Sequence, residues 1–265
     1  MISRKMSDRA FQTFTYLALI FMLLPGALVV LFSFSATQEM AFPFRGPSMR
    51  WYGAAFSDPA VLHGLFNSIV LAVISSLCAV IMGTAAAIAV ARAKRRTAIF
   101  FSSVISLPML IPPLILGISL STLFAAITIP SSLATACLGH ILLLLPLAFV
   151  FVTARLARFD WCVEEASRDL GAGPFRTFFW VVLPAIRPAI FGAFAIMFAA
   201  SLDEFVVTFF TIGADFTLPT LLWSKIRYTI DPSINAIGTV LLLLSTMAML
   251  IGDRYGTVRV WKKET

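Results

Sequence analysis

The chain has 265 residues, of which 60% are hydrophobic and 12% are charged, and its mean hydropathy is +0.95. An ordinary soluble domain is about 25% charged, so this composition excludes a soluble globular enzyme, a disordered protein and a secreted disulfide scaffold. It predicts an all-α polytopic membrane protein. We attribute the net charge of +7 to the positive-inside rule of membrane topology, and we expect no nucleic-acid partner.

Six apolar segments follow one another along the chain, and each is long enough to cross about 30 Å of hydrocarbon as a helix. The first follows a basic N-terminus, and we expect an uncleaved helix rather than a signal peptide cut near Ser35-Ala36. The sequence therefore predicts six transmembrane helices, over Phe14–Phe34, Leu65–Ala91, Ala98–Phe124, Leu133–Thr153, Pro188–Ile212 and Ile234–Tyr255.

The distribution of basic residues predicts the orientation of these helices. With the N-terminus in the cytoplasm, 16 of the 20 Lys and Arg residues fall on the cytoplasmic side, which places both termini there. The predicted division is a cytoplasmic N-terminus (1–13), a six-helix domain (14–255) with a cytoplasmic loop at 154–187, and a cytoplasmic C-terminus (256–265).

The prolines and the scattered cysteines and histidines say less about function than the basic residues say about topology. The string from Pro108 to Pro113 predicts a kink in the third segment, which either lines a pathway or bends a packed helix. The three cysteines and two histidines have no metal-ligand spacing, so we predict no metal or disulfide site and interpret both histidines, His63 and His140, as structural.

The 154–187 loop has the densest charge in the chain and predicts two short helices around a corner. Glu164 and Arg168 are spaced i,i+4 on the first, which runs from about Trp161 to Leu170. Gly171 supplies a C-terminal stop, and Pro174 suits the first position of the second helix. That second helix is expected at Phe175–Val182, ended by the prolines that follow it, Pro184 and Pro188. Its aromatic side chains indicate a surface that docks on a partner, although a solvated hairpin between two spans is the alternative.

The loop resembles the EAA loop of binding-protein-dependent ABC importer permeases. The family pattern is E-A-A, three residues, Gly, nine residues, then I-x-L-P. This chain has Glu165-Ala166-Ser167, then Gly171, then Val181-Val182-Leu183-Pro184, so the spacing matches throughout. Ser for the second Ala and Val for Ile are mild departures.

The resemblance implies a type I ABC importer permease in the bacterial inner (plasma) membrane. It implies a second permease subunit, two cytoplasmic ATPase subunits and a periplasmic binding protein as partners, beside membrane lipid. The chain is then no enzyme: it binds no cofactor, has no phosphate-loop motif, and leaves ATP and Mg to the ATPases. By carry-over, the ATPase-coupling residues are Glu165, Ala166, Ser167, Gly171, Ala172, Gly173 and Pro174.

Two adjacent acids, Asp203 and Glu204, lie about 15 residues into the fifth segment, near or just outward of its middle. A charge within a membrane is costly, about 2.5–3.5 kcal/mol on insertion scales. One interpretation is a counter-charge for a cationic substrate in transit. The other is pairing with a basic residue of a second subunit, or capping of a broken backbone.

The string Ser201–Phe210 resembles the fifth-span motif of spermidine/putrescine permease subunits, and so do Thr217-Leu218-Pro219, the stretch from Asp231 to Ala236, and Trp51-Tyr52 with Asn67-Ser68. The likeness is greatest to the second permease of that system and implies a heterodimer and a polyamine-like cation. Trp223 and Tyr228 either contact that cation or anchor the chain at the interface. Betaines, opine-like compounds, amino acids, thiamine and ferric iron are the alternative substrates.

Two other functional classes are weaker predictions. An ion-coupled secondary transporter would use Asp203 or Glu204 as its cation site and would show repeat symmetry between halves, which the sequence lacks. An intramembrane enzyme would need a nucleophile–base pair or metal ligands within the spans.

Overall fold

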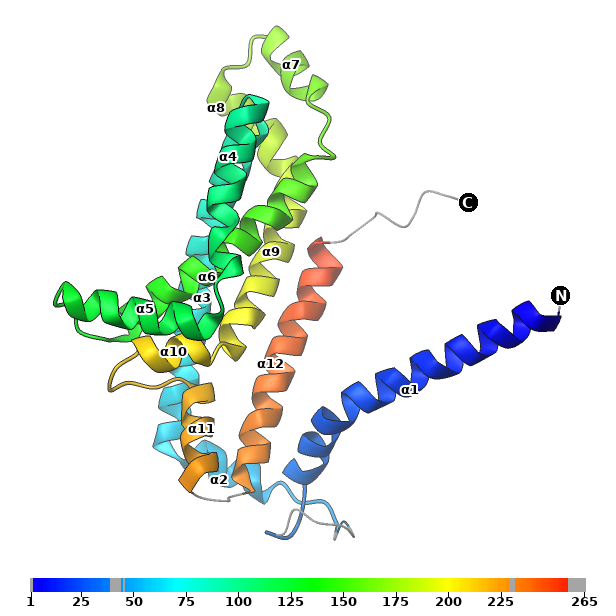
Figure 1. The fold of residues 1–265 in the computed structure, drawn as a ribbon, viewed down its shortest axis with the longest axis vertical. Helices are drawn as coiled ribbons and strands as arrows, with labels where there is room; N and C mark the ends of the chain where they lie inside the picture. The colour runs from blue at the N-terminus through cyan, green and yellow to red at the C-terminus, as the bar shows by residue number, and fades with distance from the viewer. Residues whose placement is uncertain (1, 39–43, 45, 229–231, 257–265) are drawn as a thin grey trace. The chain divides into compact units, whose positions relative to one another are not determined.

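The computed structural model describes the backbone of residues 2–38, 44, 46–228 and 232–256, and the side chains within these ranges except for residues 2–10, 228, 255 and 256 (Figure 1). Its described residues form helices joined by short loops, with no β-strand among them, which confirms the all-α prediction. The elements are α1 (Ile2–Ser33), α2 (Arg50–Ser57), α3 (Pro59–Ala91), α4 (Arg95–Ser106), η1 (Leu107–Leu110), α5 (Pro113–Ala126), α6 (Leu133–Leu156), α7 (Cys162–Asp169), α8 (Pro174–Thr177), η2 (Phe178–Val182), α9 (Leu183–Asp203), α10 (Val206–Thr211), α11 (Leu218–Tyr228) and α12 (Ser233–Gly256).

Five stretches of helix in the described part of the chain are long and apolar enough to cross a membrane. They correspond to the first, second, fourth, fifth and sixth predicted segments. The sixth possible span is the pair α4 with η1 and α5, which passes the same test only when its two parts are taken together. The prediction of six spans is therefore supported with the third as a broken one.

The third predicted segment is not one straight helix. Arg95–Leu110 and Pro113–Ala126 meet at an angle of 96°. Pro112 has extended backbone (φ −56°, ψ 137°), which the ring of Pro113 enforces because it disfavours the α conformation in the residue before it. The prolines thus cause a sharp break, larger than the kink that the sequence predicts.

The fifth predicted segment has wrong bounds at both ends. The helix begins at Pro174 and ends at Asp203, instead of running over Pro188–Ile212. Pro184 and Pro188 do not end it. A proline inside an α-helix crowds the carbonyl group four residues earlier. The wide π-helical turn η2 lies there, directly before Leu183 and Pro184, so the helix continues through the proline. A single continuous element therefore connects the 154–187 loop to the acidic pair.

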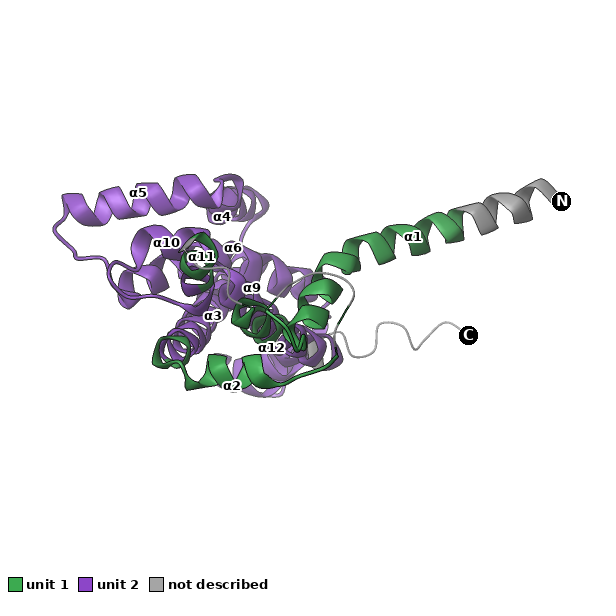
Figure 2. Ribbon diagram, turned by 90° about the horizontal axis from the view of Figure 1, so that it is seen from below, with its two compact units in different colours: residues 1–62, 222–242 green, residues 63–221, 243–265 purple. Residues whose placement is uncertain are grey.

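The chain divides into two compact units, residues 1–62 with 222–242 and residues 63–221 with 243–265 (Figure 2). In the second unit, α3, α6 and α9 pack through small residues, and Ala79, Ala148 and Ala193 are fully buried. Gly83 allows the close approach of α3 to α6, since a Cβ there would lie 2.8 Å from the backbone nitrogen of Phe149. This core carries both functional regions described below.

The first unit holds the loop after α1 by polar contacts. The indole N–H of Trp51 donates to the carbonyl of Ser35 at 2.7 Å. The hydroxyls of Ser33 and Tyr52 lie 2.8 Å apart.

The hydrogen bond from Lys225 Nζ to Asp58 Oδ2, 2.8 Å long, lowers the pKa of the Asp58 carboxyl below its ordinary value. A depressed pKa in the folded state contributes stability above the unfolded-state pKa, and that stability is lost as the pH falls through the folded-state pKa. We expect Asp58→Asn to cost about 0.5 kcal/mol at pH 7 and to cost less at an acidic pH below the folded-state pKa. Thermal unfolding of the two proteins across this pH range measures the difference. An equal cost at both pH values would contradict the ion pair.

Candidate functional site

The 154–187 loop presents a tight corner between α7 and α8. The N–H of Gly171 donates to the carbonyl of Arg168 at 2.8 Å, and the N–H of Ala172 donates to that of Ser167 at 3.1 Å. This pair of bonds is a Schellman motif, which requires a left-handed residue at the position of Gly171. Its φ of +83° meets that requirement. The first helix, the glycine stop and the start of the second helix at Pro174 are therefore as the sequence predicts, but the second helix continues past Val182 instead of ending there.

The corner is exposed on its apolar side. Leu170 is 89% exposed and Phe175 80% exposed. A Cβ added to Gly171 or to Gly173 would meet nothing within 4 Å. Large exposed apolar side chains beside free space are what the predicted docking surface requires, and the assignment of a docking role stays a prediction.

The predicted coupling residues lie together at this corner. Glu165 and Ala166 are exposed on α7, and Gly171, Gly173 and Pro174 are exposed at the turn. Ser167 and Ala172 are half-buried, and the hydroxyl of Ser167 lies 3.1 Å from that of Thr177, which joins the two helices.

Glu164, directly before the predicted coupling residues, holds the loop to the rest of its unit. Its buried carboxylate accepts two hydrogen bonds from Arg92 Nη2 at 3.0 and 3.1 Å and one from Arg168 at 2.7 Å. The pair with Arg168 is the predicted i,i+4 interaction. The bond to Arg92, the residue directly after α3, joins residues 72 positions apart, and no local sequence signal reveals it.

We expect Glu164→Gln to loosen α7, because the amide carries no charge to balance two guanidinium groups. Hydrogen exchange of the backbone amides of residues 162–170 should become about ten times faster, since breaking this partly exposed network removes on the order of 1–2 kcal/mol. Asp169→Asn is the matched control, an exposed carboxylate on the same helix. Equal exchange rates in the two variants would contradict a clamping role for Glu164.

The acidic pair lies at a break between α9 and α10, not inside a continuous helix as predicted. Asp203 is the last residue of α9, and Glu204 has extended backbone (φ −72°, ψ 111°). The Glu204 side chain accepts the N–H of Val207 at 2.9 Å and so caps the first turn of α10. The Asp203 side chain is exposed and accepts a hydrogen bond from the hydroxyl of Ser245. Of the two interpretations left open by the sequence, capping of broken backbone describes Glu204, and Asp203 remains open to a ligand or a partner.

The remaining two predicted pathway residues belong to the other unit. Trp223 lies on α11 and is 44% exposed. Tyr228 is the last residue of α11, and its side chain lies outside the described residues. Their part in the pathway stays a prediction.

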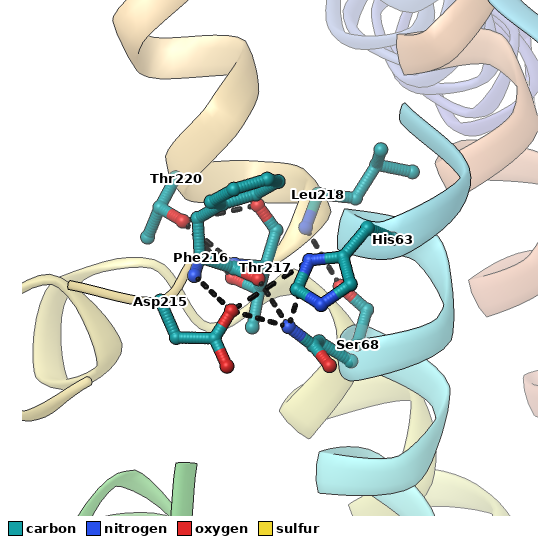
Figure 3. Close-up of polar contacts among 8 residues, drawn as sticks. His63, Ser68, Asp215, Phe216, Thr217, Leu218 and Thr220 are labelled. Atoms are coloured by element: carbon teal, nitrogen blue, oxygen red, sulfur yellow. Dashed lines mark hydrogen bonds and ion pairs between the residues drawn. The ribbon is translucent and has the colours of Figure 1, made fainter. Parts of the chain in front are cut away.

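Asn67 and Ser68 on α3 hold the segment that follows α10. The Asn67 amide donates to Asp215 Oδ1 at 2.7 Å and to the carbonyl of Phe216 at 2.9 Å. The hydroxyl of Ser68 accepts the N–H of Leu218 at 2.8 Å, as Figure 3 shows. In the sequence these two residues stand out only through the family resemblance. Their observed contacts fix the loop that leads from α10 to α11.

Comparison with known proteins identifies the family of this chain. Residues 79–257 match the family described as the binding-protein-dependent transport system inner membrane component, a match that includes the 154–187 loop and the acidic break. The chain belongs to this family. It is thus an inner-membrane permease of an ABC importer, as the EAA-loop resemblance implied.

Relatives of this permease span most of its length. The putrescine transport system permease protein PotI of Escherichia coli K12 is 34% identical over 84% of this chain and 82% of its own. The spermidine/putrescine transport system permease protein PotC of the same strain is 29% identical over 87% of each chain. A solved bacterial ABC transporter that imports alginate has the same fold, with a TM-score of 0.71 at 15% identity, and covers 96% of this chain and 97% of that one.

Proposed function

We propose that this permease forms one half of the translocation pathway for a polyamine such as putrescine or spermidine, or for a similar cationic amine. The observation that carries the proposal is the α9–α10 break, where an exposed carboxylate, Asp203, stands beside the capping carboxylate of Glu204. Interrupted helices expose functional groups within membranes, and an acid there attracts a cation. The names of the relatives PotI and PotC support a polyamine as the cation.

The depth of the break fits a pathway residue. Sixteen residues of helix separate Arg187 from Asp203, which corresponds to about 24 Å at about 1.5 Å per residue. If Arg187 marks the cytoplasmic interface, as the basic-residue count predicts, Asp203 lies within the outer third of a hydrocarbon layer about 30 Å thick. A cation released from a binding protein at the outer face would reach this carboxylate first.

The energy would come from partner subunits through the 154–187 loop. In this proposal the exposed corner at Gly171 inserts into a groove on a cytoplasmic ATPase, with Glu165 and Ala166 on its rim. ATP and Mg bind the ATPases, and their closure moves the docked helices. The continuous element Pro174–Asp203 then carries that movement to the acidic break. A second permease subunit, two ATPase subunits and a periplasmic binding protein complete the complex, with both termini of this chain cytoplasmic.

The test is uptake of radiolabelled putrescine and spermidine into proteoliposomes that contain the full complex, compared with proteoliposomes from which the ATPase is omitted. The proposal predicts uptake that needs the ATPase, ATP and the loaded binding protein. Uptake without the ATPase, driven by an ion gradient, would favour a secondary transporter and overturn the coupling mechanism. Uptake of another solute alone would overturn the polyamine assignment.

A further inference from the structure

A buried histidine connects both sides of the α9–α10 break. His140 lies on α6, and its side chain is 0% exposed. Its Nδ1 lies 2.7 Å from the hydroxyl of Ser201, two residues before the end of α9. Its Nε2 lies 2.7 Å from the hydroxyl of Thr208, in the first turn of α10. One imidazole therefore joins three helices at the point where the fifth span is interrupted.

The hydrogen bonds of this network share a limited number of protons. A fully buried imidazole whose described partners are both hydroxyls is neutral and carries one N–H, because burial of an unpaired charge is costly. With the proton on Nε2, Thr208 accepts from the imidazole and donates to the carbonyl of Glu204 at 3.0 Å, and Ser201 donates to Nδ1. With the proton on Nδ1, Thr208 donates to Nε2, and Ser201 accepts from the imidazole and donates to Ser75, whose own proton goes to the carbonyl of Leu71 at 2.6 Å. In either tautomer the imidazole is hydrogen-bonded to Ser201 of α9 and to Thr208 of α10.

The neighbouring residue on α6 allows α10 to come this close. A Cβ on Gly139 would lie 2.7 Å from Cγ1 of Val207, so this position has no room for a side chain. Ser201 continues the network on the other side, with its hydroxyl 3.0 Å from that of Ser75 on α3. Consecutive residues of α6 thus admit α10 and hold it.

We propose that His140 is the positioning residue of the substrate pathway: it holds Ser201 and Thr208 on the two sides of the break, keeps the fifth span interrupted, and so fixes where Asp203 and Glu204 present their carboxylates. The role of those acids rests on the proposed function. The link from His140 to Ser201 and Thr208, here called the brace, is a property of this chain. Such a residue acts on substrate affinity through the acids and does not touch substrate.

The first test measures putrescine and spermidine uptake by the complete complex with His140→Ala, His140→Gln and Thr84→Val. Loss of the brace should raise the half-saturating concentration about tenfold in the alanine variant, with a smaller change in the maximal rate. Glutamine keeps one donor and one acceptor on the same side chain and should restore part of the affinity. Thr84→Val is the matched control, because the Thr84 hydroxyl is buried and without a hydrogen-bond partner among the described residues. An unchanged half-saturating concentration in the alanine variant would overturn the proposal.

The second test does not depend on the substrate. Hydrogen exchange of the backbone amides of residues 204–211 should be about tenfold faster in His140→Ala than in the wild-type complex, and unchanged in Thr84→Val. If His140→Ala fails to reach the membrane, Thr208→Val removes the same link and Thr208→Ser keeps it. A wild-type complex that takes up neither polyamine would refute the proposed function while leaving this exchange test decisive for the brace. Equal hydrogen-exchange rates in the wild type and in the His140→Ala or Thr208→Val variant would refute the brace and leave the proposed function untouched.

Discussion

Gly171→Trp should abolish ATP-driven uptake while leaving the permease in the membrane at its normal level. The left-handed φ of +83° strains a residue with a bulky side chain, and it ends α7 by the Schellman motif. Among the described residues nothing lies within 4 Å of an added Cβ at this position, so an indole would project outward into the space where we propose that the ATPase docks. Loss of function would therefore arise at the docking surface and not in the core.

Gly46→Trp is the matched control for this variant. Gly46 also has a positive φ, of +95°, and also has nothing within 4 Å of an added Cβ, but it lies outside the 154–187 loop. Uptake and membrane abundance should be near normal for Gly46→Trp. Gly171→Asn adds a further comparison, because asparagine tolerates the left-handed conformation; its residual activity measures how much of the defect is side-chain bulk. Normal ATP-driven uptake by Gly171→Trp would contradict the docking assignment.

Asp203→Asn and Glu204→Gln should each impair polyamine uptake, and Asp203→Asn should have the larger effect. Both amides keep the local geometry, since an amide oxygen can still accept from Ser245 or from the N–H of Val207. The negative charge alone is removed. Loss of one partner of a desolvated charge pair weakens binding by about tenfold or more, and Asp203 has the more exposed side chain.

The charge-retaining variants Asp203→Glu and Glu204→Asp separate charge from shape. Half-saturating concentration and maximal rate of putrescine uptake are measured for all four variants beside the wild type. We expect Asp203→Glu to keep more affinity than Asp203→Asn. Glu204→Asp shortens the cap on α10 and should lose more than Glu204→Gln if capping is the main role of Glu204. Normal transport by both amide variants would eliminate the counter-charge idea.

Hydropathy predicted the number of spans because membrane insertion depends on summed transfer free energy, which composition determines. Hydropathy did not reveal the breaks in the third and fifth segments, because composition alone does not record the direction of the backbone. Pro113 bends a stretch that stays apolar on both sides, and the apolar residues of α10 continue the pattern of α9 past the break at Glu204. An average over a window cannot detect a change in backbone direction.

The local part of the functional loop was predictable, and its long-range contacts were not. Gly171, Pro174 and the Glu164–Arg168 pair act over four residues or fewer, so spacing alone indicates them. The bond from Arg92 to Glu164 and the brace from His140 to Ser201 and Thr208 join helices far apart in the sequence. The buried contacts of His140 agree with the structural role predicted for it, and they lie on the two sides of the acidic break.

The most direct test of the account is the ATPase activity of the reconstituted complex, stimulated in turn by binding protein loaded with spermidine, putrescine, a betaine, an amino acid or thiamine. The account predicts stimulation by the polyamine-loaded protein alone, abolished by Gly171→Trp in this permease. Stimulation by another ligand would keep the importer and contradict the polyamine assignment. Failure of the permease to assemble with any ATPase would contradict the coupling role of the 154–187 loop.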